Sequence, residues 1–306
     1  MKRLWPTLLL VLVCAGGFWF ASSKNFFREA EPKPQAFVTV KAEEVQSLSV
    51  ESADNQVALQ RKDSGWEMTK PGPAPVSANQ AESWISSLGL VTQEKLVEEH
   101  PANLATYGLD KPLQTYRITL KDGTSKALLV GQPLPIQGYS YAKLEDAPGV
   151  YQVSDQSLGL LNHTPVDFID AQPIAFDADK VQSAKLVWKG QTWLLTKSEK
   201  DKPAADAKWK LGDKELTGAD ASGLLNGLTF LRTSQLTKSV AEAPTAGGEL
   251  SLEVTLDDNG SAKTQQYEGK LSDTLVWLSQ QGGAWAYALT SEDVQKTADD
   301  FAAKSK

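Results

Sequence analysis

The sequence predicts an α+β protein in which an N-terminal transmembrane helix precedes two tandem copies of a domain made of antiparallel sheet and helix. Three observations predict this fold class: an uncharged run at the N-terminus, a long internal repeat, and short alternating runs bounded by turn signals. The pattern of residues 76–88 recurs without a gap in residues 216–228. A separation this long indicates a duplicated domain, and 306 residues suffice for two domains.

The repeat divides the chain into four parts. These are a membrane anchor (residues 1–23), a spacer (24–36), a first copy (37–170) and a second copy (171–306). A second landmark agrees, since the run Val-Gln-Ser at 45–47 returns at 181–183. The spacer is polar and proline-bearing with no apolar period, which is typical of a linker.

The anchor is the uncharged run of residues 4–21, headed by Lys2 and Arg3. As a helix this run reaches about 27 Å, close to the thickness of a bilayer core. The two cations indicate a cytoplasmic N-terminus, which makes the protein a single-pass component of the cell membrane with its bulk extracytoplasmic. Two alternatives stay open: a signal peptide cleaved at the small residues 21–23, and a lipoprotein modified at Cys14. No cysteine follows Cys14, so we expect no disulfide in the exported body.

The first half of each copy predicts small antiparallel strands followed by one amphipathic helix. Strands are expected at 45–50, 57–60 and 65–68. Ser77 and Gln80 form a capping-box pattern, and Thr217 with Asp220 repeats it in the second copy. The apolar positions that follow have helical spacing in both copies: Ala81, Trp84, Ile85 and Leu88, then Ala221, Leu224, Leu225 and Leu228.

The second half of each copy predicts hairpins and a closing helix. The expected strands are at 116–120, 126–130, 139–144 and 149–153 in the first copy, and at 252–256, 274–278 and 285–289 in the second. Ser154 and Thr290 are the expected caps of the closing helices. The lysine-rich stretch 197–208 is the main insertion, as a surface loop tolerates.

Residues 107–112 read YGLDKP, residues 121–123 read KDG, and a predicted strand ends at Val130-Gly131. This pattern resembles the bacterial DUF4340 family, and the resemblance covers about residues 45–300. It implies an anchored, exported protein of unknown function, and related proteins are associated with gliding-motility-type ABC transporter systems. The second copy departs from the pattern, because residues 242–248 stand where the tyrosine-glycine segment would be. If that segment contacts a partner, only the first copy makes the contact.

The sequence offers few residues for catalysis or metal binding. His100 and His163 are the two histidines, and Glu98 with His100 is the nearest approach to a metal-ligand pair. The acidic runs 177–179 and 257–260 are explained by turn chemistry, because their spacing does not fit a calcium loop. We therefore predict no catalytic, metal or cofactor site. Carboxylates are abundant, and an acid pair is the one route to an enzyme that the sequence leaves open.

Of the nine tryptophans, two lie in the anchor and the other seven divide into core and surface candidates. We expect Trp66, Trp84 and Trp209 in the core. The best candidates for a binding surface are four tryptophans in predicted strands: Trp188, Trp193, Trp277 and Trp285.

The function expected from the sequence is a non-catalytic extracytoplasmic interaction module that contacts an envelope protein, with the membrane reached through residues 4–21. An auxiliary place in an ABC transporter assembly is implied by the resemblance alone. The alternative is an extracytoplasmic receptor with its ligand in the cleft between the copies, which a pocket lined by Trp and Tyr from both copies would favour. A formal charge of −7 argues against nucleic acid as a partner.

Overall fold

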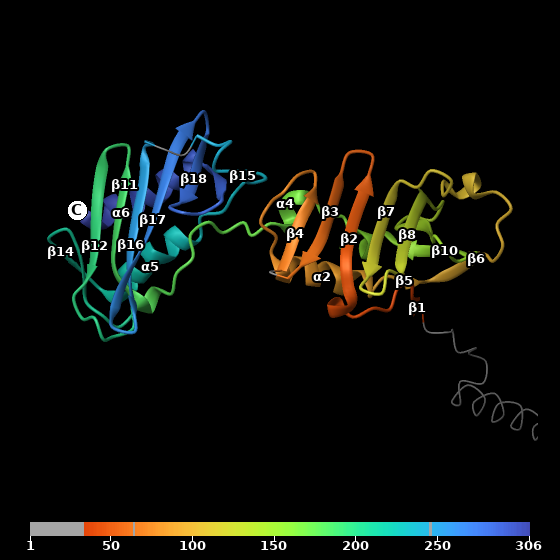
Figure 1. Ribbon diagram of the computed structural model, residues 1–306, viewed down its shortest axis with the longest axis horizontal. Helices are drawn as coiled ribbons and strands as arrows, with labels where there is room; N and C mark the ends of the chain where they lie inside the picture. The colour runs from red at the N-terminus through yellow and green to blue at the C-terminus, as the bar shows by residue number, and fades with distance from the viewer. Residues whose placement is uncertain (1–33, 64, 245–246) are drawn as a thin grey trace, which may run out of the picture.

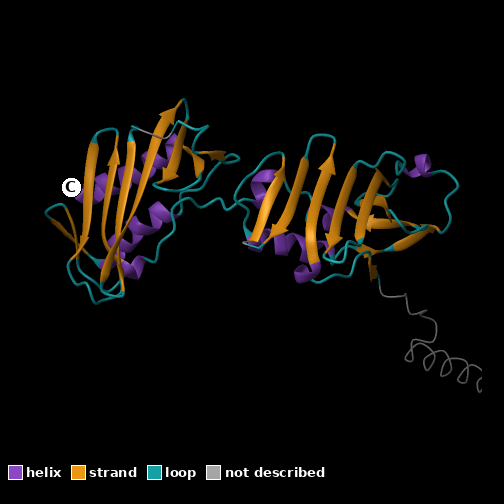
Figure 2. Cartoon of the chain, viewed as in Figure 1, coloured by secondary structure: helices purple, strands orange, loops and turns teal. Residues whose placement is uncertain are grey.

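The computed structural model describes residues 34–63, 65–244 and 247–306. The predicted transmembrane helix and most of the spacer lie outside the described residues. Within those ranges, none of the helices combines the length and apolar character needed to cross a membrane. The described chain forms two domains side by side, each an antiparallel sheet with helices packed against one face (Figures 1 and 2). The predicted α+β class is confirmed.

The first domain is built on an eight-stranded antiparallel sheet with the order β4-β3-β2-β7-β8-β9-β10-β6. Its strands are β2 (Val45–Ser52), β3 (Gln56–Lys62), β4 (Gly65–Lys70), β6 (Lys95–Glu98), β7 (Gln114–Leu120), β8 (Ser125–Pro133), β9 (Tyr139–Leu144) and β10 (Val150–Ser154). Its helices are η1 (Ala42–Glu44), α2 (Ala78–Leu88), η2 (Leu104–Tyr107), α3 (Asp155–Gly159) and α4 (Pro165–Phe168). A separate pair, β1 (Gln35–Ala36) and β5 (Thr92–Gln93), marks the point where the described chain begins.

The second domain is built on a nine-stranded sheet with the order β14-β13-β12-β11-β16-β17-β18-β19-β15. Its strands are β11 (Val181–Trp188), β12 (Gln191–Lys197), β13 (Trp209–Leu211), β14 (Lys214–Leu216), β15 (Lys238–Ser239), β16 (Leu250–Asp258), β17 (Ser261–Ser272), β18 (Leu275–Gln280) and β19 (Trp285–Thr290). Its helices are η3 (Ala178–Lys180), α5 (Gly218–Thr229) and α6 (Ser291–Ser305).

The two sheets have the same strand order, apart from the extra edge strand β14. In both, the first strand pairs with the strand after the helix: Leu48 of β2 lies opposite Ile118, and Ala184 of β11 lies opposite Val254. The hairpin pairings on either side follow the same register. The two sheets therefore share one topology.

Helices α2 and α5 carry the predicted apolar stripes into two separate cores. All eight stripe positions are buried. Trp84 is the centre of the first core, where its indole Nε1 donates a hydrogen bond to the Leu161 carbonyl at 2.9 Å. Trp66 and Trp209 are also buried, so all three core tryptophans are confirmed.

The caps of the first domain differ from the prediction. Ser77 precedes α2 but makes no side-chain cap, so the capping box predicted there is wrong. Its backbone N–H donates to the Phe168 carbonyl of α4 instead, which ties the helix start to the next layer. Ser154 likewise makes no side-chain cap, and α3 is only five residues long. In the second domain, Thr217 and Thr290 do accept hydrogen bonds from the backbone N–H three residues on.

Strand β17 is absent from the prediction. Its first six residues have little burial, and Tyr267 and Gly269 are its two buried positions. Because most of the strand is polar on both faces, it lacks the apolar alternation that identifies strands in a sequence.

Candidate functional site

The tyrosine-glycine segment folds over one end of the first sheet. Asn103 begins η2 by accepting a hydrogen bond from the Ala105 backbone at 3.0 Å, and Gly108 ends it with a φ of 67°. Gly131 in β8 lies directly beneath, because a Cβ atom added there would meet the Tyr107 carbonyl oxygen at 2.1 Å. Gly108 is therefore required by a left-handed turn, and Gly131 is required by a close backbone approach.

This packing holds the Tyr107 side chain over the sheet. Its ring lies 5.0 Å from the ring of Tyr141 in β9, in an edge-to-face arrangement. Its hydroxyl donates a hydrogen bond to the Glu98 carboxylate at the end of β6. That hydrogen bond, together with some burial, raises the pKa of the Tyr107 phenol. The segment thus ties β9 to the edge strand β6.

The histidines do not form a site. His100 is exposed just after β6, and Glu98, its predicted neighbour in a metal pair, is occupied by Tyr107. His163 lies in the connection between α3 and α4, where its ring contacts Phe168 at 5.2 Å and its carbonyl accepts from Asn55. In the described part of the chain, no three or more His, Cys, Asp or Glu side chains are grouped as metal ligands.

The acidic run 257–260 forms a turn, as predicted, and in the run 177–179 Asp177 caps the short helix η3. Asp177 accepts a hydrogen bond from the Asp179 backbone at 3.0 Å, and Asp179 in turn accepts from the Ala204 backbone at 2.7 Å. Asp257 accepts from the Gly260 backbone at 2.7 Å. Asp177 and Asp257 satisfy local backbone N–H groups, which is the ordinary role of Asp in a turn or cap, and Asp179 holds the loop that contains Ala204.

Several other carboxylates are held in the charged form. In each, hydrogen bonds lower the pKa of the carboxyl group. One example is Glu145, whose pKa is lowered chiefly by the hydrogen bond from Arg117 at 2.6 Å. A catalytic carboxylic acid needs the opposite shift, because it must hold a proton near neutral pH. The carboxyl groups with lowered pKa are those of Asp122, Glu145, Glu199, Asp220 and Glu249.

The prediction of a tryptophan binding surface is wrong for three of its four residues. Trp188, Trp193 and Trp277 are all buried, with 9% or less of each residue exposed. Trp188 and Trp193 belong to the main core of the second domain, and Trp277 packs with two alanines under the connection that contains Ala243. Half-buried Trp285 is the exception. Trp193 lies on the covered face of β12, whereas Leu194 next to it lies on the open face and is 47% exposed.

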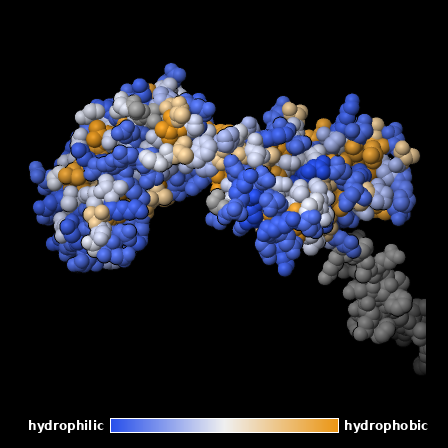
Figure 3. All heavy atoms as spheres, in the orientation of Figure 1, coloured by the Kyte–Doolittle hydropathy of each residue, from blue (hydrophilic) through white to orange (hydrophobic). Residues whose placement is uncertain are grey.

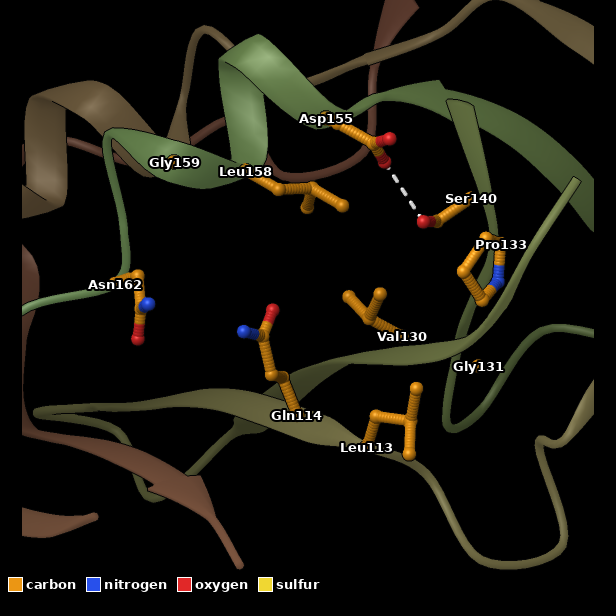
Figure 4. A pocket seen from close by; sticks show the side chains of 10 residues that line it. All are labelled: Leu113, Gln114, Val130, Gly131, Pro133, Ser140, Asp155, Leu158, Gly159 and Asn162. Atoms are coloured by element: carbon orange, nitrogen blue, oxygen red, sulfur yellow. Dashed lines mark hydrogen bonds between the residues drawn. The ribbon is translucent and has the colours of Figure 1, made fainter. Parts of the chain in front are cut away.

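A cavity of about 300 Å³ lies at the end of the first sheet that carries the tyrosine-glycine segment. Gln114 and Leu158 point toward its centre from opposite sides (Figure 4). The Ser140 hydroxyl on its wall donates a hydrogen bond to the Asp155 carboxylate at 2.7 Å. The Gln114 carbonyl oxygen accepts from the buried Tyr116 hydroxyl, which leaves the amide N–H groups free to donate.

In the second domain the corresponding positions are filled. The strand register places Leu250 where the first domain has Gln114, and Val276 where it has Ser140. Both side chains are buried. The closing helix α6 has 15 residues where α3 has five, and its Gln295 accepts from the indole of Trp188 at 2.8 Å. The two domains therefore differ most at this end of the sheet.

The same end of the first domain exposes apolar side chains that the sequence reasoning missed. Five of the eight large apolar residues exposed in the described ranges belong to it. They are Leu96 and Val97 on β6, Leu113 before β7, Ile136 between β8 and β9, and Leu160 after α3. Orange atoms at the far end of this domain in Figure 3 mark apolar surface there. The signal was available at 96–97, where two adjacent apolar residues break the alternation of a short strand.

A second cavity, of about 330 Å³, lies where the two domains meet. The first domain contributes the loop 71–73, and the second contributes Lys238, Glu242 and Trp285 among others. Its lining contains no tyrosine and takes its tryptophan from the second domain. The receptor alternative requires aromatic rings from both copies, and in this cavity only the second domain supplies one.

Comparison with known proteins gives one match. A family model described as a domain of unknown function, DUF4340, matches residues 66–249, which is more than half of the chain. The match runs from β4 of the first domain to the residue just before β16 in the second. No curated protein and no solved structure matches the chain.

Proposed function

Because the chain belongs to the DUF4340 family, which has no defined function, we propose a role from the surface of the chain itself: a non-catalytic, membrane-anchored extracytoplasmic interaction module. Residues 4–21 are its anchor, with the N-terminus in the cytoplasm and the two domains outside.

The observation that carries this proposal is the exposed apolar end of the first domain. Contiguous apolar surface on a soluble domain commonly marks a place where another protein binds. The equivalent end of the second domain is closed by Leu250, Val276 and α6. The first domain is therefore the half of the molecule that contacts a partner.

The position of this end relative to the anchor identifies the kind of partner. The described chain starts at β1, which pairs with β5, and β5 leads within two residues into β6. The apolar end thus adjoins the place where the spacer delivers the chain from the membrane. A partner embedded in or lying on the same membrane is within reach, and we propose an ABC-type transporter assembly, as the family resemblance implies.

We also propose that the two domains arose by duplication and then diverged. Equal strand order and equal register support this, while the differences gather at one end of the sheet. Divergence at that end fits a binding role retained by one copy.

Two measurements on the full chain test the proposal. Alkaline extraction should leave the protein in the membrane fraction, and protease added to spheroplasts should digest both domains. A photo-cross-linking residue at Ile136 should then capture a transporter permease, whereas the same residue at Lys185, exposed on β11 of the other domain, should not. Equal capture at both positions, or protection of the domains from protease, would overturn the proposal.

The receptor alternative rests on the cavity between the domains. Trp285 gives it one half-buried aromatic wall, so a ligand there should change the tryptophan emission of the protein and lose that effect in Trp285→Phe. Capture of a permease at Ile136 with no such ligand effect separates the two functions.

A further inference from the structure

The cavity of about 300 Å³ in the first domain has two polar side chains that are each held from behind by a buried hydroxyl. Tyr116, which is fully buried, donates to the Gln114 carbonyl oxygen at 2.7 Å. Ser140, which is 8% exposed, donates to one oxygen of the Asp155 carboxylate at 2.7 Å (Figure 4). Because the orientations of both side chains are fixed, the Gln114 amide N–H groups and the second Asp155 oxygen remain available to a ligand.

The second domain has apolar side chains at the positions of this network. The strand register gives the equivalents of Gln114, Tyr116 and Ser140 as Leu250, Leu252 and Val276, in that order. All three belong to the core of the second domain. Buried polar groups cost stability unless they are hydrogen-bonded, and an apolar set holds this end of a sheet without that requirement. Stability alone therefore does not explain the polar set of the first domain.

The rest of the lining sets the chemistry of an occupant. Val130 and Leu158 are buried apolar walls, and the exposed Leu113 extends the apolar part. Asp155 is the one charged residue of the lining and forms no salt bridge within the described chain. Since the lining contains no lysine or arginine, a carboxylate or phosphate of a ligand would meet no cation there. The cavity thus fits a cation, an oxygen acceptor and an apolar group.

We propose that this cavity binds the free amino terminus of a peptide whose first residue is apolar. The terminal ammonium pairs with Asp155, the first peptide carbonyl accepts from Gln114, and the first side chain lies against Val130 and Leu158. A free amino acid carries a carboxylate in place of that carbonyl and fits less well. A volume of about 300 Å³ is at the lower end of the range for ligand sites, which suits the first residues of a chain. The site requires neither the membrane nor a transporter, so it goes beyond the proposed function.

Peptide binding to the full chain in lipid nanodiscs is the direct test. A ligand-detected NMR titration with leucyl-glycinamide should show saturable binding, because this probe supplies all three groups. Three matched probes each lack one group: N-acetyl-leucyl-glycinamide lacks the ammonium, glycyl-glycinamide lacks the apolar side chain, and leucine lacks the peptide carbonyl. Each should bind at least about fivefold more weakly. Absence of saturable binding by leucyl-glycinamide, or equal binding by any of the three matched probes, would overturn the proposal.

A change of charge locates the binding in this cavity. Asp155→Asn keeps an acceptor for Ser140 and removes the charge, so it should weaken leucyl-glycinamide by about fivefold and leave its N-acetyl form unchanged. Asp63→Asn is the matched control, because Asp63 is an exposed aspartate of the same domain outside the lining, and it should bind like the wild type. Equal affinities of these two variants for leucyl-glycinamide would contradict the role of Asp155.

A second variant removes the interior donor. Gln114→Leu combined with Tyr116→Phe gives this end of the sheet apolar side chains, as in the second domain. Both partners of one hydrogen bond are removed together, so neither is left unpaired. We expect cooperative thermal unfolding and no detectable binding of leucyl-glycinamide. Wild-type affinity in this folded variant would overturn the assignment of the carbonyl to Gln114.

The outcomes separate this site from the proposed function. A chain that captures a permease at Ile136 but does not bind leucyl-glycinamide refutes the peptide site alone. A chain that binds leucyl-glycinamide but captures no permease refutes the transporter role and leaves the site standing.

Discussion

Arg61 and Lys197 occupy the same position in the two domains, and each lies over a tryptophan on the neighbouring strand. Arg61 pairs with Trp66 across β3 and β4, with its guanidinium 4.6 Å from the ring centre. Lys197 pairs with Trp209 across β12 and β13, with its ammonium 5.7 Å from the ring centre. Both cations also donate to backbone carbonyls at the start of their domains. A cation held in this way connects the segment that opens its domain, η1 and β2 or η3, to the strand that carries the tryptophan.

Lys197 is 2% exposed, so its aliphatic stem and its charge can be tested separately. Lys197→Ala removes a buried stem and should cost the second domain about 2–3 kcal/mol. Lys197→Met keeps a stem of similar length and loses the cation–ring contact and one hydrogen bond, which is worth about 1 kcal/mol. Urea unfolding followed by tryptophan fluorescence measures both. Equal costs for Ala and Met would mean that the charge, and not the stem, is responsible.

The two cores should respond independently to substitution. Trp84→Ala removes a fully buried indole from the first core and leaves a cavity, so it should destabilise that domain by about 3–5 kcal/mol. The matched variant Leu224→Ala, at the equivalent position of α5, should cost the second domain about 2–5 kcal/mol. Hydrogen exchange measures each effect, with faster exchange expected in α2 or in α5. Exchange that rises equally in both helices would contradict the independence of the cores.

The sequence predicts the parts of the fold that depend on repeated local patterns. The stripe of Trp84 and its neighbours and the hairpin around residues 121–123 follow from spacing and turn chemistry. Strand β17 was missed because its register is fixed by pairing with β16 and β18, which a polar sequence does not reveal. Ser77 looked like a cap, but α4 engages its backbone from elsewhere in the chain.

The candidate site was less predictable because it depends on which surfaces remain uncovered. Tryptophans in strands suggest a binding surface, but Trp188 and Trp193 are buried against α6. Gln295 of α6 accepts a hydrogen bond from Trp188, and Phe301 of α6 packs against Trp193. Leu96 and Val97 are apolar residues of the kind expected in a core strand. They are exposed because β6 lies at a sheet edge. Sequence spacing assigns a residue to a strand face, but the strand order decides whether that face meets solvent.

Tyr116 should make the stability of the first domain depend on alkaline pH. It is fully buried, and desolvation raises the pKa of its phenol in the folded state. The folded state therefore holds this proton more tightly than the unfolded state. Its stabilising effect is complete below pH of about 10 and is lost as the pH rises through the folded pKa, at about 1.4 kcal/mol per pH unit.

The variant Tyr116→Phe isolates this effect from that of the other tyrosines. At pH 7 the variant should be about 1 kcal/mol less stable than the wild type, because it lacks the hydrogen bond to Gln114. Between pH 10 and pH 11 its free energy of unfolding should fall less than that of the wild type. Urea unfolding at the three pH values gives the difference. An unchanged slope between pH 10 and pH 11 would show that Tyr116 ionises without opening the domain.

Gly131→Ala should release the tyrosine-glycine segment from the sheet. The added Cβ would lie 2.1 Å from the Tyr107 carbonyl oxygen, and because that atom is backbone, the whole segment has to shift. We expect a loss of about 1–3 kcal/mol and faster hydrogen exchange in residues 104–112, since Tyr107 would lose its fixed position over Tyr141. Gly159→Ala is the control, because a Cβ there meets nothing within 4 Å, and its exchange should match the wild type. If Gly131→Ala left exchange in residues 104–112 unchanged, the close approach would not be what holds the segment, and the glycine would need another explanation.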